Sequence, residues 1–368
     1  MNPIIKLLQN LGAFQRIVGD SSNLIGVAKA DALLNDLVNH KKVPGIATTI
    51  IKSDKILLQK GYGYADLESK KIIDPKKTVF RIASISKNIA AATLAHLVDE
   101  GVMKLDASLY DYVPYYPKKE YDFTIRQLAS HTAGIRGYKG VEYGLNKPYS
   151  IKEGIDIFKN DPLIFKPGTQ YLYNSFDWAL LSLAMQEASG VAFADLVQEK
   201  IFNPLNMLNT YAGANPSETN SETSSYKIAN LTTFYSKNKT GFRIAIPVNN
   251  YYKLAGGGYL STSEDIAKFG RALLKNQVFS AKMNIEFLTS QKVNDENTFY
   301  GLGWQVSEDN KGRPFFGHVG NGVGGYSNFF VYPNEKMVFS ILINCTDPKV
   351  QDEIDEIVSS ILSETIQT

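Results

Sequence analysis

Cysteine and histidine are scarce in this sequence, and their scarcity limits the chemistry that it can support. The only cysteine among the 368 residues is Cys345, which excludes an internal disulfide framework and every multi-thiolate metal site. The four histidines lie far apart, at residues 40, 96, 131 and 318. None forms the His-x-x-x-His pair that places two metal ligands on one helix face. We therefore expect no metal ion and no zinc-dependent activity.

An excess of charge of one sign is also lacking. The 39 Lys and Arg residues nearly balance the 37 Asp and Glu residues, which gives a formal net charge of +2. A protein that binds nucleic acid gathers phosphates with a surplus of positive charge. We therefore expect no nucleic-acid partner.

Long apolar runs are missing as well. The longest candidate, residues 89–98, is interrupted by His96 and is shorter than the ~18 residues that cross a bilayer. The first residues, MNPIIKLLQNLGAFQ, contain no continuous apolar stretch and no small-residue cleavage site. We expect no transmembrane segment and see no signal peptide. The location stays open between the cytoplasm and a periplasmic or other extracytoplasmic space.

The composition is that of an ordinary folded protein. Hydrophobic residues make up 44% of the chain and charged residues 21%, which excludes a disordered, collagen-like or coiled-coil chain. At roughly 150 residues per domain, the length suggests two or three structural units.

Strand patterns lie near both ends of the chain, and helical patterns lie mostly between them. The predicted strands are residues 46–51, 56–62, 303–307, 326–332 and 338–344. The predicted helices are residues 28–40, 84–100, 124–130, 151–159, 175–189, 194–201, 263–274 and 350–362. We therefore predict an α+β fold in which one antiparallel sheet, assembled from the two ends of the chain, is flanked by helices.

This order of elements suggests how the domains are arranged. We expect an N-terminal extension over residues 1–25, a sheet domain over residues 26–104 and 250–368, and an inserted, mostly helical domain over residues 105–249. Within the insertion, residues 215–239 are rich in Ser, Thr and Asn and predict an exposed loop or edge hairpin. A cleft is expected where the sheet and the helical domain meet.

The motif Ser-x-x-Lys pairs a nucleophile with a base, and it occurs at residues 84–87, 224–227 and 236–239. Only the first match begins a helix that is apolar nearly all round and therefore buried. Residues three apart share a helix face, so Lys87 would hold its amine beside the Ser84 hydroxyl. Burial favours the neutral amine, which can take the serine proton, and the Ser84 N–H can bind an oxyanion. The alternative is that Ser84 only caps the helix and Lys87 lies on the surface.

Further segments, taken in chain order, extend this interpretation. They read VPGIATTII, GYGYADLESKK, FRIASISKNIAAATLAHLVDEGVMKLDASLYDYVP, LASHTAGI, PGTQYLYNSFDWALLSLAMQEASG, LAGGGYLSTSEDIAKF and YGLGW followed by GHVGNGVGGYSNFFVYP. From about residue 44 onward, the sequence resembles the serine β-lactamase and penicillin-binding-protein superfamily. It looks most like the class C-like branch, which includes esterases, D-amino-acid peptidases and a mitochondrial serine β-lactamase-like protein. The resemblance implies a β-lactamase/transpeptidase-like fold and chemistry through an acyl-enzyme.

The resemblance assigns roles to three side chains. Ser84 becomes the acylated nucleophile, and Lys87 becomes its proton-relay partner. Tyr173, in the stretch Tyr173-Asn174-Ser175, matches the tyrosine that acts as general base. A phenol near an ammonium group would have its pKa lowered, so Lys87 and Tyr173 could share one proton. The alternative is that Tyr173, one of 21 tyrosines, only packs a helix start.

Ser175 stands where the family usually has an asparagine, and we expect it to face the substrate. A hydroxyl is shorter than an amide and does not offer a separate donor and acceptor. Its contact with a substrate amide is therefore in question. Asn174 could take its place if the loop turns differently.

The Lys-Thr-Gly strand motif of β-lactamases reads His318-Val319-Gly320 here, and His-x-Gly is frequent in the esterases and peptidases of this branch. The resemblance implies that this edge strand places His318 and Gly320 beside the substrate and supplies the Asn321 N–H as the second oxyanion donor. Without the lysine and the threonine, the strand lacks the groups that hold a β-lactam or D-Ala carboxylate, so efficient β-lactamase activity is not expected. His318 is either a neutral core histidine or orients the substrate or Tyr173.

The remaining motifs point to no other chemistry. Glycines at residues 320, 322 and 325 satisfy Gly-x-Gly-x-x-Gly but lead into a strand, whereas dinucleotide binding requires a helix start. The Gly-x-Ser-x-Gly elbow of α/β-hydrolases is absent. His131, in LASHTAGI, matches a family signature and is interpreted as structural. The glycines at residues 256–258 predict a loop beside the cleft.

Together these patterns predict a serine hydrolase that acts through an acyl-enzyme on an amide or a carboxylic ester. The amide would belong to a peptide, including one with a D-residue. The expected partner is a small-molecule or peptide substrate, and no metal or organic cofactor is expected. The second hypothesis is a penicillin-binding sensor or a filament-forming, self-associating scaffold with little turnover, which the departures at Ser175 and His318 motivate.

Overall fold

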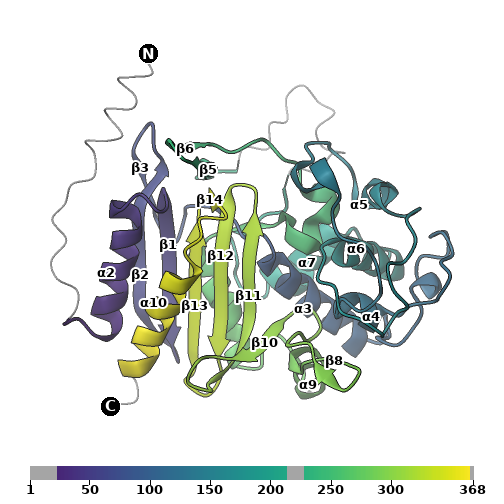
Figure 1. The fold of residues 1–368 in the computed structure, drawn as a ribbon. Helices are drawn as coiled ribbons and strands as arrows, with labels where there is room; N and C mark the ends of the chain where they lie inside the picture. Colours follow the sequence, from purple (N-terminus) through teal and green to yellow (C-terminus); the bar gives the residue numbers. More distant parts are fainter. Residues whose placement is uncertain (1–22, 214–227, 365–368) are drawn as a thin grey trace.

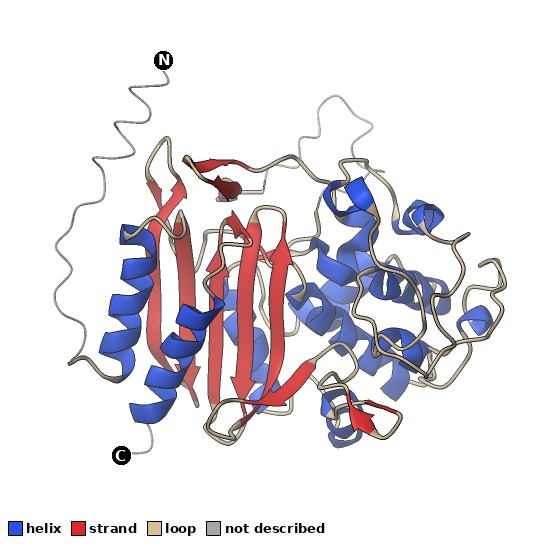
Figure 2. Cartoon of the chain, viewed as in Figure 1, coloured by secondary structure: helices blue, strands red, loops and turns tan. Residues whose placement is uncertain are grey.

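A computed structural model describes residues 23–213 and 228–364 (Figure 1). Residues 1–22 of the predicted N-terminal extension and the Ser-x-x-Lys match at residues 224–227 lie outside the described residues. The predicted α+β class is confirmed, because a seven-stranded antiparallel sheet has helices on both faces (Figure 2).

Both ends of the chain contribute strands to this sheet, as the sequence predicts. In spatial order the strands are β10 (Gln305–Glu308), β11 (Pro314–Gly322), β12 (Gly325–Tyr332), β13 (Met337–Ile343), β1 (Gly45–Lys52), β2 (Lys55–Asp66) and β3 (Lys71–Ile72). β1 pairs with β13, where Ile46 lies opposite Ile343. This pairing joins the N-terminal and C-terminal segments at the middle of the sheet.

Helices cover both faces of the sheet and bury its central strands. β1 reads GIATTIIK and β13 reads MVFSILI, and such continuous apolar and β-branched runs are typical of strands covered on both sides. α2 (Gly26–Asn39) and α10 (Gln351–Glu364) pack together on one face (Figure 2). α3 (Ile85–Asp99) and α8 (Ser263–Leu274) lie on the other face.

The region beside the sheet is mostly helical. It contains α4 (Ile125–Ala129), α5 (Ile151–Gly154), α6 (Phe176–Ser189) and α7 (Phe193–Val197), and α6 packs against α3. A hairpin of β5 (Tyr235–Asn238) and β6 (Gly241–Ile244) ends the region. β5 pairs with β14 (Cys345–Thr346), which follows β13. This hairpin connects the end of the predicted helical insertion to the strand that follows β13. The limits of the domains therefore stay a prediction.

Several short elements escape the sequence patterns. They are α9 (Ala281–Leu288), β8 (Lys292–Val293), β9 (Glu296–Asn297), β4 (Phe80–Arg81) and β7 (Leu260–Ser261). β4 pairs with β7. This pair fixes the chain just before Ser84 beside the chain just after the glycines at residues 256–258, and so sets one side of the cleft.

Among the described helices, none is by itself both long enough and apolar enough to cross a membrane. One bent pair, Phe176–Ser189 with Phe193–Phe202, meets the requirement by length and composition alone, with an angle of 84° between its parts.

Candidate active site

Ser84 lies where β4 leads into α3. The preceding residue, Ala83, has a left-handed φ of 45°, and such a backbone, which costs about 1–3 kcal/mol, is concentrated at functional sites. Ser84 itself has helical backbone angles, and its side chain makes no capping hydrogen bond. The alternative that Ser84 only caps the helix is therefore wrong. Its side chain instead lines a cavity between the sheet and the helical region.

Lys87 follows one turn later and is fully buried, so the alternative of a surface lysine is wrong. Its Nζ lies 3.1 Å from the Ser84 Oγ and 3.4 Å from the Ser175 Oγ. It also donates a 2.6 Å hydrogen bond to the carbonyl of Gly256. The turn Leu254–Gly258, which contains this glycine, therefore holds the amine in position.

The electrostatic setting of Lys87 favours its neutral form. Its pKa is lowered to about 7, chiefly by burial and also by the positive charge of Lys253, while Asp177 acts in the opposite direction. Near neutral pH a substantial fraction of the amine is therefore uncharged and can accept a proton. This agrees with the direction that the sequence predicts.

Tyr173 contacts the same oxygen from the helical region. Its hydroxyl donates a 2.7 Å hydrogen bond to the Ser84 Oγ, and the Lys87 Nζ lies 4.7 Å from the centre of its ring. Burial raises the pKa of the phenol, and the hydrogen bond with Ser84 only partly offsets this. The prediction that a nearby ammonium lowers the pKa of Tyr173 is therefore wrong, because desolvation dominates.

A buried polar cluster lies behind Tyr173. The ring of His131 packs 4.7 Å from the Tyr173 ring, centre to centre, and its Nδ1 lies 2.7 Å from the Asp177 Oδ2. Burial lowers the pKa of His131 and raises that of Asp177. The Asn174 Nδ2 donates to the same carboxyl oxygen at 2.6 Å. Asn174 therefore points into the interior and does not take the place of Ser175.

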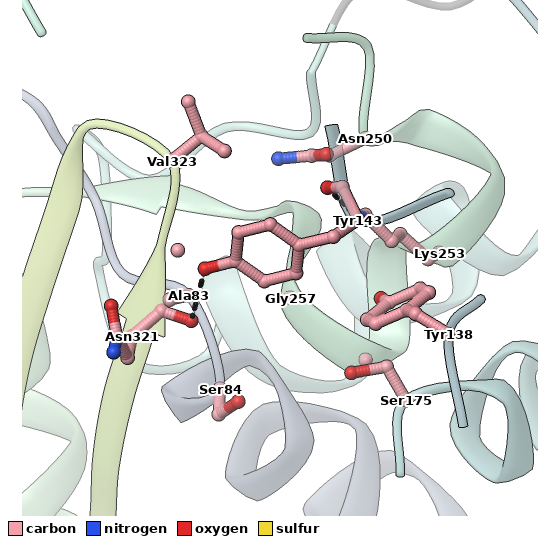
Figure 3. Close-up of a pocket in the computed structure, with 12 residues that line it drawn as sticks. Ala83, Ser84, Tyr138, Tyr143, Ser175, Asn250, Lys253, Gly257, Asn321 and Val323 are labelled. Carbon is pink, nitrogen blue, oxygen red and sulfur yellow. Dashed lines mark hydrogen bonds between the residues drawn. The ribbon is translucent and has the colours of Figure 1, made fainter. Parts of the chain in front are cut away.

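β11 presents backbone groups on the other side of Ser84. The prediction of an edge strand is wrong, because β10 lies outside β11, but β10 pairs only with residues 314–317. Further along, Asn321 lies opposite Tyr326 of β12, and its carbonyl accepts a 3.5 Å hydrogen bond from the Tyr143 hydroxyl across the cavity (Figure 3). The N–H and C=O of one residue in an antiparallel strand point to the same side. The Asn321 N–H therefore also faces the cavity.

Gly320 lets β11 approach the start of α3. A Cβ at this position would overlap the Ser327 Oγ, and it would lie 2.6 Å from the Ile82 carbonyl oxygen and 3.1 Å from the Ser84 nitrogen. Only glycine fits this gap. The close approach brings the amides of Ser84 and Asn321 to the same end of the cavity.

Of the three residues predicted to face the substrate, Ser175 lines the cavity, whereas Gly320 and His318 do not. His318 is buried, with its Nε2 3.1 Å from the Tyr300 hydroxyl, and its Nδ1 donates to the Val319 carbonyl. Burial lowers the pKa of His318 to about 3, so the imidazole is neutral. These contacts favour the core-histidine alternative.

Sequence reasoning pointed to the loop at residues 138–147 but did not find Asn250 and Lys253, which line the same cavity. Tyr138, Tyr143, Asn250 and Lys253 form its wall on the helical side (Figure 3). The only available signal was the position of Lys253 just before the predicted cleft-side glycines. Within the described ranges, no three His, Cys, Asp or Glu side chains are placed to hold a metal ion.

Comparison with known proteins adds independent evidence. The sequence model of the family described as Beta-lactamase matches residues 30–360. The human serine beta-lactamase-like protein LACTB, mitochondrial, is 30% identical over 82% of this chain and 71% of its own length. Protein flp of Staphylococcus aureus strain MRSA252 is 24% identical over 89% of this chain and 63% of its own.

Solved structures show the same fold. D-amino acid amidase from Ochrobactrum anthropi SV3, in complex with L-phenylalanine, superposes with a TM-score of 0.79 at 19% identity, over 91% of this chain and 98% of its own. An octameric penicillin-binding protein homologue from Pyrococcus abyssi reaches a TM-score of 0.74 at 24% identity, over 88% of this chain and 74% of its own.

Proposed function

Because this chain belongs to the beta-lactamase family, we propose that it is a serine hydrolase that forms an acyl-enzyme on Ser84. The observation that carries the proposal is the position of the Ser84 Oγ, 2.7 Å from the Tyr173 hydroxyl and 3.1 Å from the Lys87 Nζ. A nucleophile within hydrogen-bond reach of a base is the arrangement that activates a serine.

The neutral Lys87 amine serves as the base. It takes the proton of the Ser84 hydroxyl while the Oγ forms a bond to the substrate carbonyl carbon. The protonated Tyr173 hydroxyl remains a donor beside the reacting oxygen and gives its proton to the leaving amine or alcohol as the carbonyl re-forms. In deacylation the Tyr173 oxygen takes a proton from the attacking water, and the Lys87 ammonium returns a proton to the Ser84 Oγ as the acyl group leaves.

Two backbone amides support the oxyanion. The Ser84 N–H lies at the start of α3, where the first amides of a helix have no partner within the helix, and the Asn321 N–H faces the cavity from β11. Such fixed donors are worth about 2.7–4 kcal/mol each in transition-state stabilisation. They require no metal or organic cofactor in this proposal.

The substrate belongs to one of two classes, an amide, including a peptide with a D-residue, or a carboxylic ester. The named amidase shares the fold with this chain, and a fold alone does not select a substrate. A panel of esters, D-peptides and β-lactams measured side by side separates these classes. We expect weak β-lactam turnover, because the His318-Val319-Gly320 strand carries no lysine.

The nucleophile is tested with a fluorophosphonate probe and short p-nitrophenyl esters. We expect wild type to be labelled and to turn over the esters, and Ser84→Ala to do neither. Ser236→Ala is the matched control, because Ser236 begins another Ser-x-x-Lys match. Its Oγ, in the hairpin of β5 and β6, forms a hydrogen bond with the Thr346 hydroxyl. Equal labelling of Ser84→Ala and wild type would exclude the proposed nucleophile.

A second candidate is a penicillin-binding sensor or a self-associating scaffold. The observation that favours it is Ser175, which replaces an amide with a shorter hydroxyl at the cavity wall. Stoichiometric acylation without release would support the sensor, and large concentration-dependent assemblies in light scattering would support the scaffold. Rapid turnover by a monomer would exclude both.

A further inference from the structure

Lys253 is a buried cation on the wall of the cavity that holds Ser84. It ends the short turn Tyr251–Lys253 and directly precedes the turn that binds Lys87. Only 5% of the residue is exposed, yet it lines the cavity together with Ser84 and Ser175. The mechanism proposed above gives Lys253 no chemical step.

Among the described residues, no carboxylate forms an ion pair with the Lys253 ammonium. The Lys253 Nζ donates to the Tyr143 carbonyl at a long 3.4 Å, and it lies 4.7 Å from the ring centre of Tyr138 and 5.5 Å from that of Tyr252. Aromatic faces stabilise a desolvated cation by about 2 kcal/mol or more. They do not replace the carboxylate that normally accompanies a buried lysine.

A second cation is placed near the same cavity. The Arg81 Nη1 donates a 2.6 Å hydrogen bond to the carbonyl of Val323, which lines the cavity on the β11 side. Its guanidinium lies 4.0 Å from the ring centre of Phe234. Among the described residues, Arg81 also forms no ion pair with a carboxylate. Lys253 lines the cavity and Arg81 is hydrogen-bonded to its wall at Val323, so both cations contribute positive charge near it.

The charge of Lys253 persists at neutral pH. Burial lowers its pKa to about 8, and the positive charge of Arg81 contributes to the shift. The amine is therefore mostly protonated at pH 7 and is incompletely solvated. An anionic ligand in the cavity would gain a charge-assisted hydrogen bond with little competition from water.

We propose that Lys253 binds a carboxylate of the substrate, so that the Ser84 site prefers acyl compounds or leaving groups that carry a free carboxylate. This inference rests on the proposed acyl-enzyme function. The strand at residues 318–320 carries no cation for such a group, and Lys253 offers one from the opposite wall, beside Tyr138 (Figure 3). Asn250 lines the same wall, and its unpartnered Oδ1 can accept a hydrogen bond from a donor group elsewhere on the bound ligand.

Two matched pairs of esters test the inference and locate the carboxylate. The acyl pair is p-nitrophenyl hydrogen glutarate and the neutral p-nitrophenyl glutaramate. The leaving-group pair is the acetyl esters of 4-hydroxybenzoate and 4-hydroxybenzamide. We expect the anionic member of one pair to have a kcat/KM at least about tenfold higher in wild type, because a charge-assisted contact is worth more than a neutral one.

Variants assign this preference to Lys253. In Lys253→Met we expect the ratio of kcat/KM for the anionic and neutral esters to fall about tenfold or more, and in Lys253→Arg we expect the ratio to be kept. Lys282→Met is the control, because Lys282 is exposed on α9 and its loss changes the net charge equally. A wild-type ratio near one in both pairs, or a ratio unchanged in Lys253→Met, would overturn the proposal.

A binding measurement separates this inference from the proposed function. Ser84→Ala has no nucleophile, but we expect glutarate to raise its Tm in a saturable way, and we expect the double variant Ser84→Ala/Lys253→Met to lose that shift. If wild type hydrolyses no ester but glutarate still raises the Tm of Ser84→Ala, the proposed function is wrong and the carboxylate site is supported. If esters are hydrolysed and glutarate produces no shift in Ser84→Ala, the carboxylate site fails.

Discussion

The Tyr173 hydroxyl donates its hydrogen bond to the Ser84 Oγ, while the Lys87 amine lies over the face of the Tyr173 ring. The amine thus stabilises no negative charge at the phenol oxygen through a hydrogen bond. Burial raises the pKa of Tyr173 and lowers that of Lys87 to about 7. In the proposed mechanism, the amine rather than the phenol is therefore the resting base.

Tyr173→Phe removes one hydroxyl and keeps the ring. We expect kcat to fall about 10²–10⁴-fold, the usual contribution of a positioned acid or base, with a smaller change in KM, because the packing of the ring against His131 is retained. Steady-state kinetics with a p-nitrophenyl ester measure this. Tyr171→Phe is the control, because the Tyr171 ring also packs near His131, whereas it is the Tyr173 hydroxyl that is hydrogen-bonded to the Ser84 Oγ. Equal losses in the two variants would contradict the role of the Tyr173 hydroxyl.

The pH dependence of acylation reports the ionisation of Lys87. Protonated Lys87 cannot accept the Ser84 proton, so kcat/KM should rise with pH, pass its half-maximum near pH 7 and level off above it. Lys253 lowers the pKa of Lys87, so Lys253→Met should move the half-maximum to higher pH. A profile measured at constant ionic strength checks both statements. A midpoint that stays in place in Lys253→Met would show that the two amines do not interact.

Local patterns predicted the part of the site that lies within one helix. Ser84 and Lys87 are three residues apart on an apolar segment, and helix periodicity alone brings them together. Tyr173 and Asn321 come from distant segments, and only the ordered set of motifs connected them to Ser84. The direction of the Tyr173 pKa was predicted wrongly, because desolvation depends on neighbours that the fold brings from several segments.

The fold, like the site, was predictable where the sequence pattern is local and long. The long apolar runs of β1 and β13 were recognisable as strands in the sequence. Strands of two residues, such as β4 and β7, are too short to show an alternating pattern. Lys253 and Tyr143 come from turns, where residue type says little about the direction of a side chain. The pairing of β4 with β7 brings the turn that contains Lys253 beside Ser84, and no local sequence pattern shows this pairing.

The cluster behind Tyr173 contributes to stability as well as to position. Asp177→Ala would leave the His131 Nδ1 and the Asn174 Nδ2 without their shared acceptor in a fully buried place. We expect the free energy of unfolding to fall by about 3 kcal/mol, as measured by urea denaturation. Asp177→Asn keeps the shape and one acceptor oxygen, and it should lose less.

Asp156→Ala is the control for the loss of a carboxylate. Asp156 pairs with Lys159 on the surface, where an ion pair is worth about 0–1 kcal/mol. A loss in Asp177→Ala no larger than that in Asp156→Ala would mean that solvent reaches the cluster and that it does not hold Tyr173.

Gly320 tests whether the spacing between β11 and α3 matters for catalysis. In Gly320→Ala the new Cβ would displace the Ser327 hydroxyl, which donates a 2.7 Å hydrogen bond to the Ile82 carbonyl. β11 must then move away from α3, which separates the amides of Ser84 and Asn321. Loss of one oxyanion donor costs about 10²–10³ in kcat, whereas overpacking costs about 1–3 kcal/mol of stability.

The two effects are separated by measuring kcat and urea denaturation on the same preparation of Gly320→Ala. A folded variant with a kcat reduced about a hundredfold or more would support the oxyanion role. Gly213→Ala is the control, because a Cβ there would meet its nearest neighbour, the Gly258 carbonyl oxygen, at an ordinary 3.8 Å. If Gly320→Ala keeps the wild-type kcat, the oxyanion is bound elsewhere, because no arrangement that uses both amides tolerates this shift of β11.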